Sequence, residues 1–355
     1  MNWSTISIII PSFNQGKYIE RTLLSILKQE YKGKVEVIVS DGGSTDNTVE
    51  ILKKYNNQII WWSEKDAGYA DAVNKGFAKA TGEIFAIQSS DDFYLQNAFN
   101  IVYNAFKSNP DISLICGREL LLNPDNSVIE GIPLLEEINP KTFLLENWWI
   151  GITQHTTFFR REYFERVKGM TFPFNPASEQ DLYYRMIQLK PGKYINDLLG
   201  VYQFHANQMT RVSDKWEEAL LHLIEHSYYD PFYTNLTNRL TIEEKQAYED
   251  FIRLFFLDSR ASKQTKEFAL GLKRNAPLIP GKTQKLISKQ LEAHLVPRPK
   301  KTFFFFRLVM YMKYHRIIGP LYRMLYHKST VGSGSITDHS NYKPIHETLI
   351  NWWKN

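Results

Sequence analysis

The fold is decided by residues 5–46, which read TISIIIPSFNQGKYIERTLLSILKQEYKGKVEVIVSDGGSTD. Residues 5–11 are an isoleucine-rich strand, and residues 18–29 carry apolar side chains at helical spacing. Residues 35–40 form a second strand, which a DGG turn ends, and residues 44–46 cap the next helix. This alternation of buried strands with helices predicts an α/β fold with a mostly parallel, doubly wound sheet.

The same alternation continues as far as residue 88. Residues 58–63 and 84–88 are predicted strands, and residues 70–81 are a predicted helix. Ligands of such sheets bind beyond the carboxyl ends of the strands. The rule singles out four loops, namely residues 11–15, 41–46, 64–69 and 89–93.

The last of these loops contains Ser89-Ser90-Asp91-Asp92, directly after a buried strand. Adjacent carboxylates repel each other unless a cation lies between them. A divalent ion with oxygen ligands, bridging to a diphosphate, fits that requirement. A helix N-cap ahead of residues 93–95 is the alternative interpretation.

Four motifs follow one another in a fixed order: SIIIPSFN at 7–14, VIVSDGGSTD at 37–46, DAGYADAVNKG at 66–76 with TGE at 81–83, and SDD at 90–92. Over about residues 5–210 the chain resembles the inverting family-2 glycosyltransferases. The resemblance implies the GT-A fold, which is a Rossmann-like, mostly parallel doubly wound sheet, followed by a helical C-terminal region.

The resemblance also implies a set of donor-binding residues. These are Pro11, Ser12, Phe13, Asn14, Asp41, Asp66, Gly68, Asp71, Asn74, Ser90 and Asp91. Phe13 is suited to stack on a nucleobase, or else to belong to the core. Asp41 matches a carboxylate that accepts from the base or ribose, although a simple turn explains it too. Gly42 replaces the second acid that is frequent in the family.

A divalent metal ion, Mn²⁺ or Mg²⁺, is the cofactor that the resemblance implies. Its ligands are Asp92, with support from Asp91 and from His205 in a tyrosine-x-x-histidine stretch. His205 could equally be structural. Ser90 stands where many members carry the first carboxylate of a DXD triplet, which indicates coordination with more water.

The second half of the chain supplies the acceptor side. Glu179 takes the position of the general base, and Asp181 that of a supporting acid or alternative base. Gln154 and His155 resemble a polar patch on the acceptor side. An acidic helix N-terminus explains Glu179 equally well in structural terms. If Glu179 removes the acceptor proton, one displacement inverts the anomeric configuration.

A UDP-sugar is the favoured donor, because Asp41 can accept from a pyrimidine N3–H. Thymidine and guanine offer comparable donors, so the base stays open. The expected acceptor is a hydroxyl of a glycan or a lipid-linked glycan, as in surface polysaccharide or glycoconjugate synthesis. Transfer to a polyprenyl phosphate is an alternative, and a non-catalytic module that binds nucleotide or glycan is another.

We divide the chain at changes in pattern. The expected parts are a catalytic domain at 1–212 (donor half 1–117, acceptor half 118–212), a helical region at 213–296, a basic aromatic segment at 297–328 and a flexible tail at 329–355. No acid occurs between residues 293 and 337, whereas eight lysines and arginines do, against a chain net charge of +5. The remainder therefore carries −3 (5 − 8).

Charge and composition bear on location. Residues 298–328 mix basic and bulky apolar side chains, which is typical of peripheral contact with an anionic membrane, or of a helix packed on the body. The acidic body argues against a nucleic-acid partner. Cys116 is the only cysteine, and we see neither a signal peptide nor a transmembrane stretch. We expect a cytoplasmic enzyme, at the inner face of the membrane if the segment binds there.

Overall fold

The computed structural model describes residues 3–124, 126, 128–131, 137–140, 143, 152–171, 178–206, 208 and 241–242. The predicted helical region, basic aromatic segment and C-terminal tail fall outside the described residues, apart from 241–242. The boundary at 117/118 lies inside a strand, so the donor and acceptor halves share one sheet.

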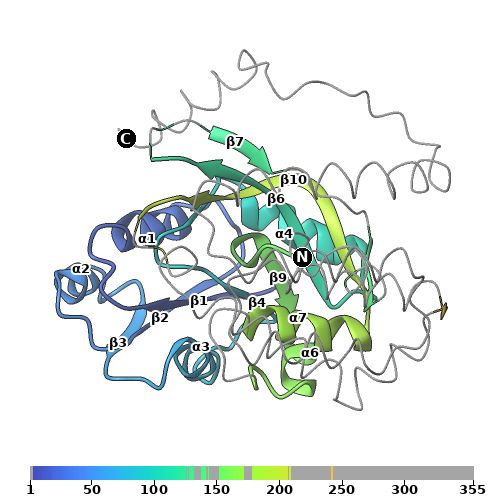
Figure 1. Cartoon of the computed structure of the whole chain (residues 1–355), viewed down its shortest axis with the longest axis horizontal. Helices are drawn as coiled ribbons and strands as arrows, with labels where there is room; N and C mark the ends of the chain where they lie inside the picture. Colours follow the sequence, from blue (N-terminus) through green and yellow to red (C-terminus); the bar gives the residue numbers. More distant parts are fainter. Residues whose placement is uncertain are drawn as a thin grey trace, which may run out of the picture. The chain divides into compact units, whose positions relative to one another are not determined.

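Strands and helices alternate along the first half of the chain (Figure 1). The elements are β1 (Ile6–Ser12), α1 (Ile19–Leu27), β2 (Val35–Asp41), α2 (Thr48–Lys54), β3 (Ile60–Ser63), α3 (Tyr69–Phe77), β4 (Ile84–Ile87), β5 (Phe93–Tyr94), α4 (Ala98–Ser108), β6 (Leu114–Leu122), β7 (Val128–Gly131), β8 (Glu137–Ile138), η2 (Gln154–Thr156), β9 (Thr157–Arg160), α6 (Arg161–Arg166), α7 (Ser178–Leu189) and β10 (Gly192–Gln203).

The described strands form one sheet in the order β3-β2-β1-β4-β9-β6-β10-β5, with β7 on β6 and β8 on β10. Strands β3, β2, β1 and β4 are parallel, as the sequence predicts. Beyond them the sheet is mixed, because β9 runs antiparallel to both β4 and β6, while β10 is parallel to β6. The chain therefore has the expected α/β architecture, with an all-parallel part that is confined to β3, β2, β1 and β4.

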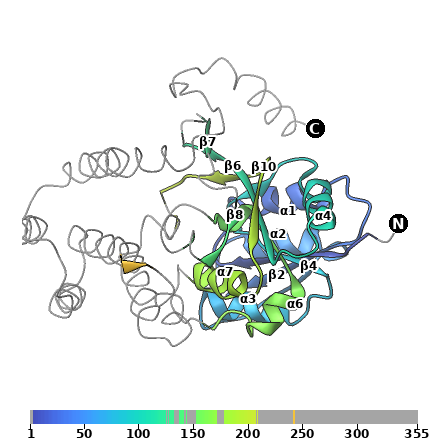
Figure 2. The same cartoon turned by 90° about the vertical axis from the view of Figure 1, so that its right-hand side faces the viewer.

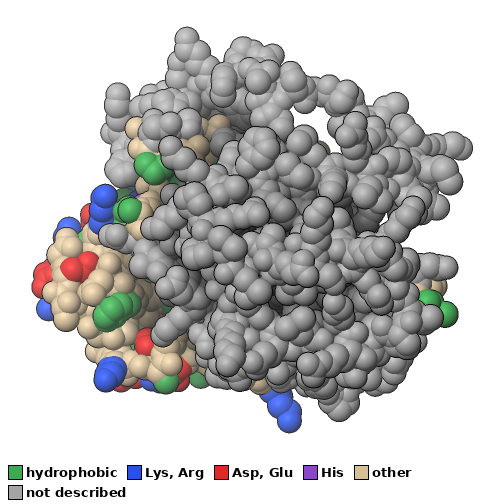
Figure 3. Space-filling view, in the orientation of Figure 1, with side chains coloured by type: hydrophobic (Ala, Val, Ile, Leu, Met, Phe, Trp, Pro, Cys, Tyr) green, Lys and Arg blue, Asp and Glu red, His purple; other side chains and the backbone are tan. Residues whose placement is uncertain are grey.

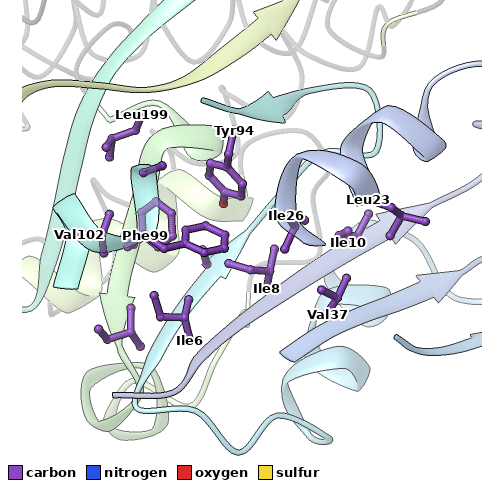
Figure 4. Close-up of a cluster of buried hydrophobic side chains, with 14 of the residues drawn as sticks. Ile6, Ile8, Ile10, Leu23, Ile26, Val37, Tyr94, Phe99, Val102 and Leu199 are labelled. Carbon is purple, nitrogen blue, oxygen red and sulfur yellow. The ribbon is translucent and has the colours of Figure 1, made fainter. Parts of the chain in front are cut away.

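Strand β1 is buried on both faces because helices cover each side of the sheet. Ile8 and Ile10 point toward α1, where they pack with Leu23 and Ile26 (Figure 4). On the opposite face, a Cβ added to Gly76 of α3 would lie 2.4 Å from Cγ2 of Ile9. Figures 1 and 2 show α1 and α4 on one side of the sheet and α3, α6 and α7 on the other.

A buried polar network joins the strands at the amino end of the sheet. The Glu36 carboxylate accepts from Ser7 Oγ (2.8 Å), Thr81 N (2.8 Å) and Lys34 Nζ (2.7 Å). Burial alone raises the pKa of Glu36, but these hydrogen bonds outweigh it and lower the pKa to about 2. The network holds the Thr81-Gly82-Glu83 turn against β1 and β2.

Among the described residues, none of the helices combines the length and apolar character needed to span a bilayer. On the part of the surface that Figure 3 colours, acidic and basic side chains are interspersed.

We predict that Ile8→Ala lowers the free energy of unfolding by about 3 kcal/mol, because it removes a fully buried side chain from a close-packed core. The matched control is Ile60→Ala on β3, whose side chain is 46% exposed and whose loss should cost less than about 1 kcal/mol. Urea denaturation of both variants measures the difference. Equal losses would contradict the core assignment.

Candidate active site

The loop after β1 is tied to the loop after β2 and presents an exposed aromatic ring. Asn14 adopts a left-handed backbone conformation (φ 53°), which asparagine tolerates better than most residues. Its Oδ1 accepts from Thr45 N (2.8 Å), and its backbone N–H donates to Ser44 Oγ (2.7 Å). The neighbouring Phe13 ring is 57% exposed, so it is no core residue and is free to stack on a ligand.

Two predicted donor carboxylates, Asp41 and Asp66, lie on adjacent loops. Asp41 is buried and accepts from Ser44 N (2.8 Å), Ser44 Oγ (2.6 Å) and Ser63 Oγ (2.6 Å). Asp66 accepts from Gly68 N (2.8 Å), and its Oδ2 lies 2.7 Å from where a Cβ on Gly42 would be. The glycine that replaces the family's second acid therefore leaves room for Asp66.

Two other predicted donor residues make contacts within the protein. Asp71 accepts from Ala67 N (3.0 Å) and pairs with Lys75 Nζ (3.0 Å). Asn74 binds the backbone of Met170 twice, through Nδ2 to its carbonyl (2.7 Å) and through Oδ1 to its N–H (3.0 Å). Asn74 thus joins α3 to the turn that follows α6.

Helix α1 holds the backbone of the SDD loop. Thr22 Oγ1 donates to the carbonyls of Ser90 (3.0 Å) and Asp92 (2.7 Å). Arg21 donates to the Asp91 carbonyl (2.9 Å) and to Oε1 of Gln203. These contacts fix the positions of both carboxylates relative to the sheet.

The two carboxylates of that loop lie in different surroundings. Asp92 is 1% exposed; its Oδ1 accepts from Gln203 N (2.9 Å), and its Oδ2 lies 3.9 Å from His155 Nδ1. Burial raises the pKa of Asp92 well above its usual range, and the charge of Asp91 raises it further. Asp91 is paired instead with His205, whose Nε2 lies 2.8 Å from its Oδ2.

The two predicted histidines flank this pair of acids. His205 stacks on Tyr18 with ring centroids 4.4 Å apart, and among the described residues its buried Nδ1 has no hydrogen-bond partner. His155 Nε2 lies 2.5 Å from Glu119 Oε2. Burial works to lower the pKa of His155, but the charges of Glu119, Asp92 and Asp91 outweigh it and raise the pKa.

Gln154, predicted on the acceptor side, also lies beside this loop. Its Oε1 accepts from Ser89 Oγ (2.9 Å), and its Nε2 donates to the Ile87 carbonyl (2.8 Å). Gln154 and His155 therefore support the end of β4 and the acidic loop.

The residues fit a divalent cation at Asp92. A buried carboxylate with a raised pKa gains most from a nearby positive charge, and hard cations prefer oxygen ligands. The described part of the chain contains no group of three or more His, Cys, Asp and Glu side chains that could hold the ion alone. The remaining ligands would come from diphosphate and water.

Glu179 lies in the first turn of α7 and is partly exposed. Burial raises its pKa to about 7. Among the described residues no side chain forms a hydrogen bond or ion pair with its carboxylate. A carboxyl with a pKa near neutrality can take up a proton at physiological pH, which is what a general base requires.

Asp181 supports the helix. It pairs with Arg185 (Nε to Oδ2, 2.8 Å), and Arg185 also donates to the carbonyls of Val167 (2.5 Å) and Gly169 (2.8 Å). Asp181 thereby fixes α7 against the same turn that Asn74 holds.

The family model for glycosyl transferase family 2 matches residues 7–168. This part of the chain belongs to glycosyl transferase family 2. An uncharacterized glycosyltransferase of Nostoc sp. is 25% identical over 228 residues, which cover 60% of this chain and 69% of that protein. The chain spans less than two thirds of the length of several other curated relatives.

Solved structures confirm the GT-A fold of the family-2 domain. Staphylococcus aureus TarS 1–349, in complex with UDP-GlcNAc, is similar with a TM-score of 0.50 and 16% identity, over 72% of this chain and 81% of that one. The mannosyltransferase PcManGT of Pyrobaculum calidifontis, in complex with GDP-Man and Mn²⁺, gives 0.51 and 17%, over 82% and 86%.

Sequence reasoning missed three residues of the family-2 domain. Thr22 was detectable from the sequence, because it is a polar residue on the apolar face of α1. In the structure it is fully buried. Arg21 and Glu119 gave no local signal, since their partners lie far away along the chain.

We predict that Glu179→Gln stabilises the domain at pH 8 by up to about 3 kcal/mol. The carboxyl has a pKa of 4.5 when unfolded and about 7 when folded, so the wild type loses stability relative to the variant as pH rises from about 4.5 to 7. Below pH 4.5 the difference should vanish. Thermal melts across this range measure it.

The matched control is Glu50→Gln, because Glu50 also lies in the first turn of a helix but is exposed. It isolates the effect of the helix dipole. If both substitutions give the same pH dependence of stability, the assignment of a raised pKa to Glu179 is wrong.

Proposed function

We propose that this glycosyltransferase moves a sugar from a nucleotide-diphosphate sugar to a hydroxyl of a glycan or lipid-linked acceptor, with inversion by single displacement. The observation that carries the proposal is Glu179, a carboxyl of raised pKa without a cationic partner among the described residues. The Asp91-Asp92 pair provides the second part of the site, at the end of a central strand. In such a displacement Glu179 is suited to act as the base, and the Asp91-Asp92 pair is suited to the side of the leaving group.

The donor nucleotide would lie over the loops after β1 and β2. The exposed Phe13 ring supplies a stacking face, and Asp41 and Asp66 supply carboxylates on neighbouring loops. We favour UDP, because a carboxylate at Asp41 can accept from a pyrimidine N3–H. TarS binds UDP-GlcNAc and PcManGT binds GDP-Man, so the fold itself admits either base.

Asp92, with Asp91 and His205, would hold the divalent cation, Mn²⁺ or Mg²⁺. When bound, such an ion stabilises the negative charge that gathers on the departing diphosphate. PcManGT is a neighbour of the same fold in complex with Mn²⁺. Arg21 and Thr22 hold the loop through its carbonyl groups and not through its carboxylates.

Glu179 would remove the proton of the acceptor hydroxyl as that oxygen attacks the anomeric carbon. Its carboxyl is about half ionised near pH 7, so transfer should rise with pH through that range. The Asp181–Arg185 pair orients the helix that carries it. Gln154 and His155 support the acidic loop that follows β4.

Two alternatives make different predictions. An acceptor that is already an anion, such as a polyprenyl phosphate, needs no base, so Glu179→Gln would keep substantial activity. A non-catalytic module would bind nucleotide without turnover. Contact between residues 298–328 and the inner face of the membrane remains a proposal from the sequence, since that segment lies outside the described residues.

We predict that one of UDP, dTDP and GDP raises the melting temperature only when Mn²⁺ is present, and that Asp92→Asn abolishes this increase. The physical reason is that the cation links the buried carboxylate to the diphosphate. Differential scanning fluorimetry measures it. Asp111→Asn is the control, because the Asp111 side chain is 86% exposed.

An increase that survives in Asp92→Asn would remove Asp92 from the metal site. If none of the three nucleotides changes the melting temperature with metal, the transferase proposal fails.

A further inference from the structure

Two buried tyrosine hydroxyls interact electrostatically with Glu179 and have no hydrogen-bond partner among the described residues. Tyr69 is the first residue of α3, and Tyr183 follows Glu179 by one turn of α7. The side chain of Tyr183 is fully buried, and so is the hydroxyl oxygen of Tyr69. Within the described part of the chain, neither hydroxyl has a hydrogen-bond partner.

These groups are close enough to act on one another electrostatically. Burial raises the pKa of Tyr69 far above 10, and the charge of Glu179 adds to that effect. The pKa of Tyr183 is raised by burial, then by Tyr69 and Glu179. Both phenols therefore stay neutral, and each keeps an O–H group to donate.

A buried hydroxyl without a partner costs about 1–3 kcal/mol, so native proteins rarely leave one unsatisfied. Two half-buried tyrosines elsewhere among the described residues have protein partners. Tyr31 donates to the Ser4 carbonyl (2.6 Å), and Tyr55 donates to Glu20 (3.2 Å). The unsatisfied pair occurs beside the proposed base, which indicates a partner that arrives with the substrate.

The position of Tyr69 indicates which part of the substrate its hydroxyl would contact. Tyr69 directly follows Gly68, in a turn fixed by bonds from Gly68 N to Asp66 and from Ala67 N to Asp71. That turn belongs to the proposed donor site, whereas Glu179 belongs to the acceptor side. In an inverting displacement the sugar ring lies between the leaving diphosphate and the base. Tyr69 adjoins the donor turn and interacts with Glu179, so it is near the place that this ring would take.

We propose that Tyr69 and Tyr183 form a recognition site for a hydroxyl group of the transferred sugar. Tyr69 donates its O–H to a ring hydroxyl of the donor, and Tyr183, the other unsatisfied hydroxyl that interacts with Glu179, donates to the same sugar. The inference rests on the proposed function and adds to it the residues that select the sugar. A site built to bind a hydroxyl rejects an analogue that lacks it.

The test is isothermal titration calorimetry on the full chain with Mn²⁺. The probes are two pairs, UDP with UDP-GlcNAc and GDP with GDP-mannose. The affinities of the variants are compared with those of the wild type for the pair that the wild type binds. Tyr69→Phe should weaken binding of the sugar nucleotide by about tenfold and that of the free nucleotide less than twofold. Tyr183→Phe should act in the same direction by about threefold, since loss of one hydrogen bond is worth up to about a factor of ten.

Tyr103→Phe is the matched control, because Tyr103 is a buried tyrosine that packs against Trp3 and Tyr31. It should change neither affinity. Retained nucleotide binding in each variant shows that the fold is intact.

The inference is overturned if Tyr69→Phe and Tyr183→Phe leave the sugar-nucleotide affinity within twofold of the wild type. It is also overturned if they weaken nucleotide and sugar nucleotide equally, because the contact is then with the nucleotide. Failure of the proposed function has a different signature, which is that the wild type binds neither pair and does not bind dTDP.

Discussion

The parallel pairing of β1 with β2 on one side and β4 on the other is the constraint on which the site depends. Parallel strands end at the same edge of a sheet, so the pairing brings together the loops that carry Phe13, Asp41 and Asp92. It is possible only because helices bury both faces, with Ile8 against α1 and Ile9 against α3. Loss of that packing would separate groups that are distant along the chain.

Helix α1 imposes a second constraint on the site, because it packs in the core and also binds the backbone of the acidic loop. Its apolar residues fill the core, while Arg21, Thr22 and Ser25 bind the backbone of residues 90–94. A buried hydroxyl is tolerated in such a helix because it is hydrogen-bonded, and here its acceptors are carbonyls of the acidic loop. The acidic loop is therefore held by the core itself, so its carboxylates are positioned before any ligand binds.

Local pattern was sufficient to predict the strands and helices from β1 to β4. Periodicity placed β1, α1 and β2 within about two residues of their observed bounds, because each is amphipathic or uniformly buried. It could not place β9 antiparallel between β4 and β6, since nothing local encodes that pairing. For the same reason local pattern could not reveal that the amide of Asn74 binds Met170 across 96 residues.

The central claim is that Asp92 holds a divalent cation against the donor diphosphate. The most direct measurement is an anomalous difference map from crystals grown with UDP and Mn²⁺, with GDP as the second nucleotide. The account predicts a manganese peak within about 2.6 Å of an Asp92 oxygen and of the diphosphate. Bound nucleotide with no manganese at Asp92, or manganese at another place in the domain, would contradict it.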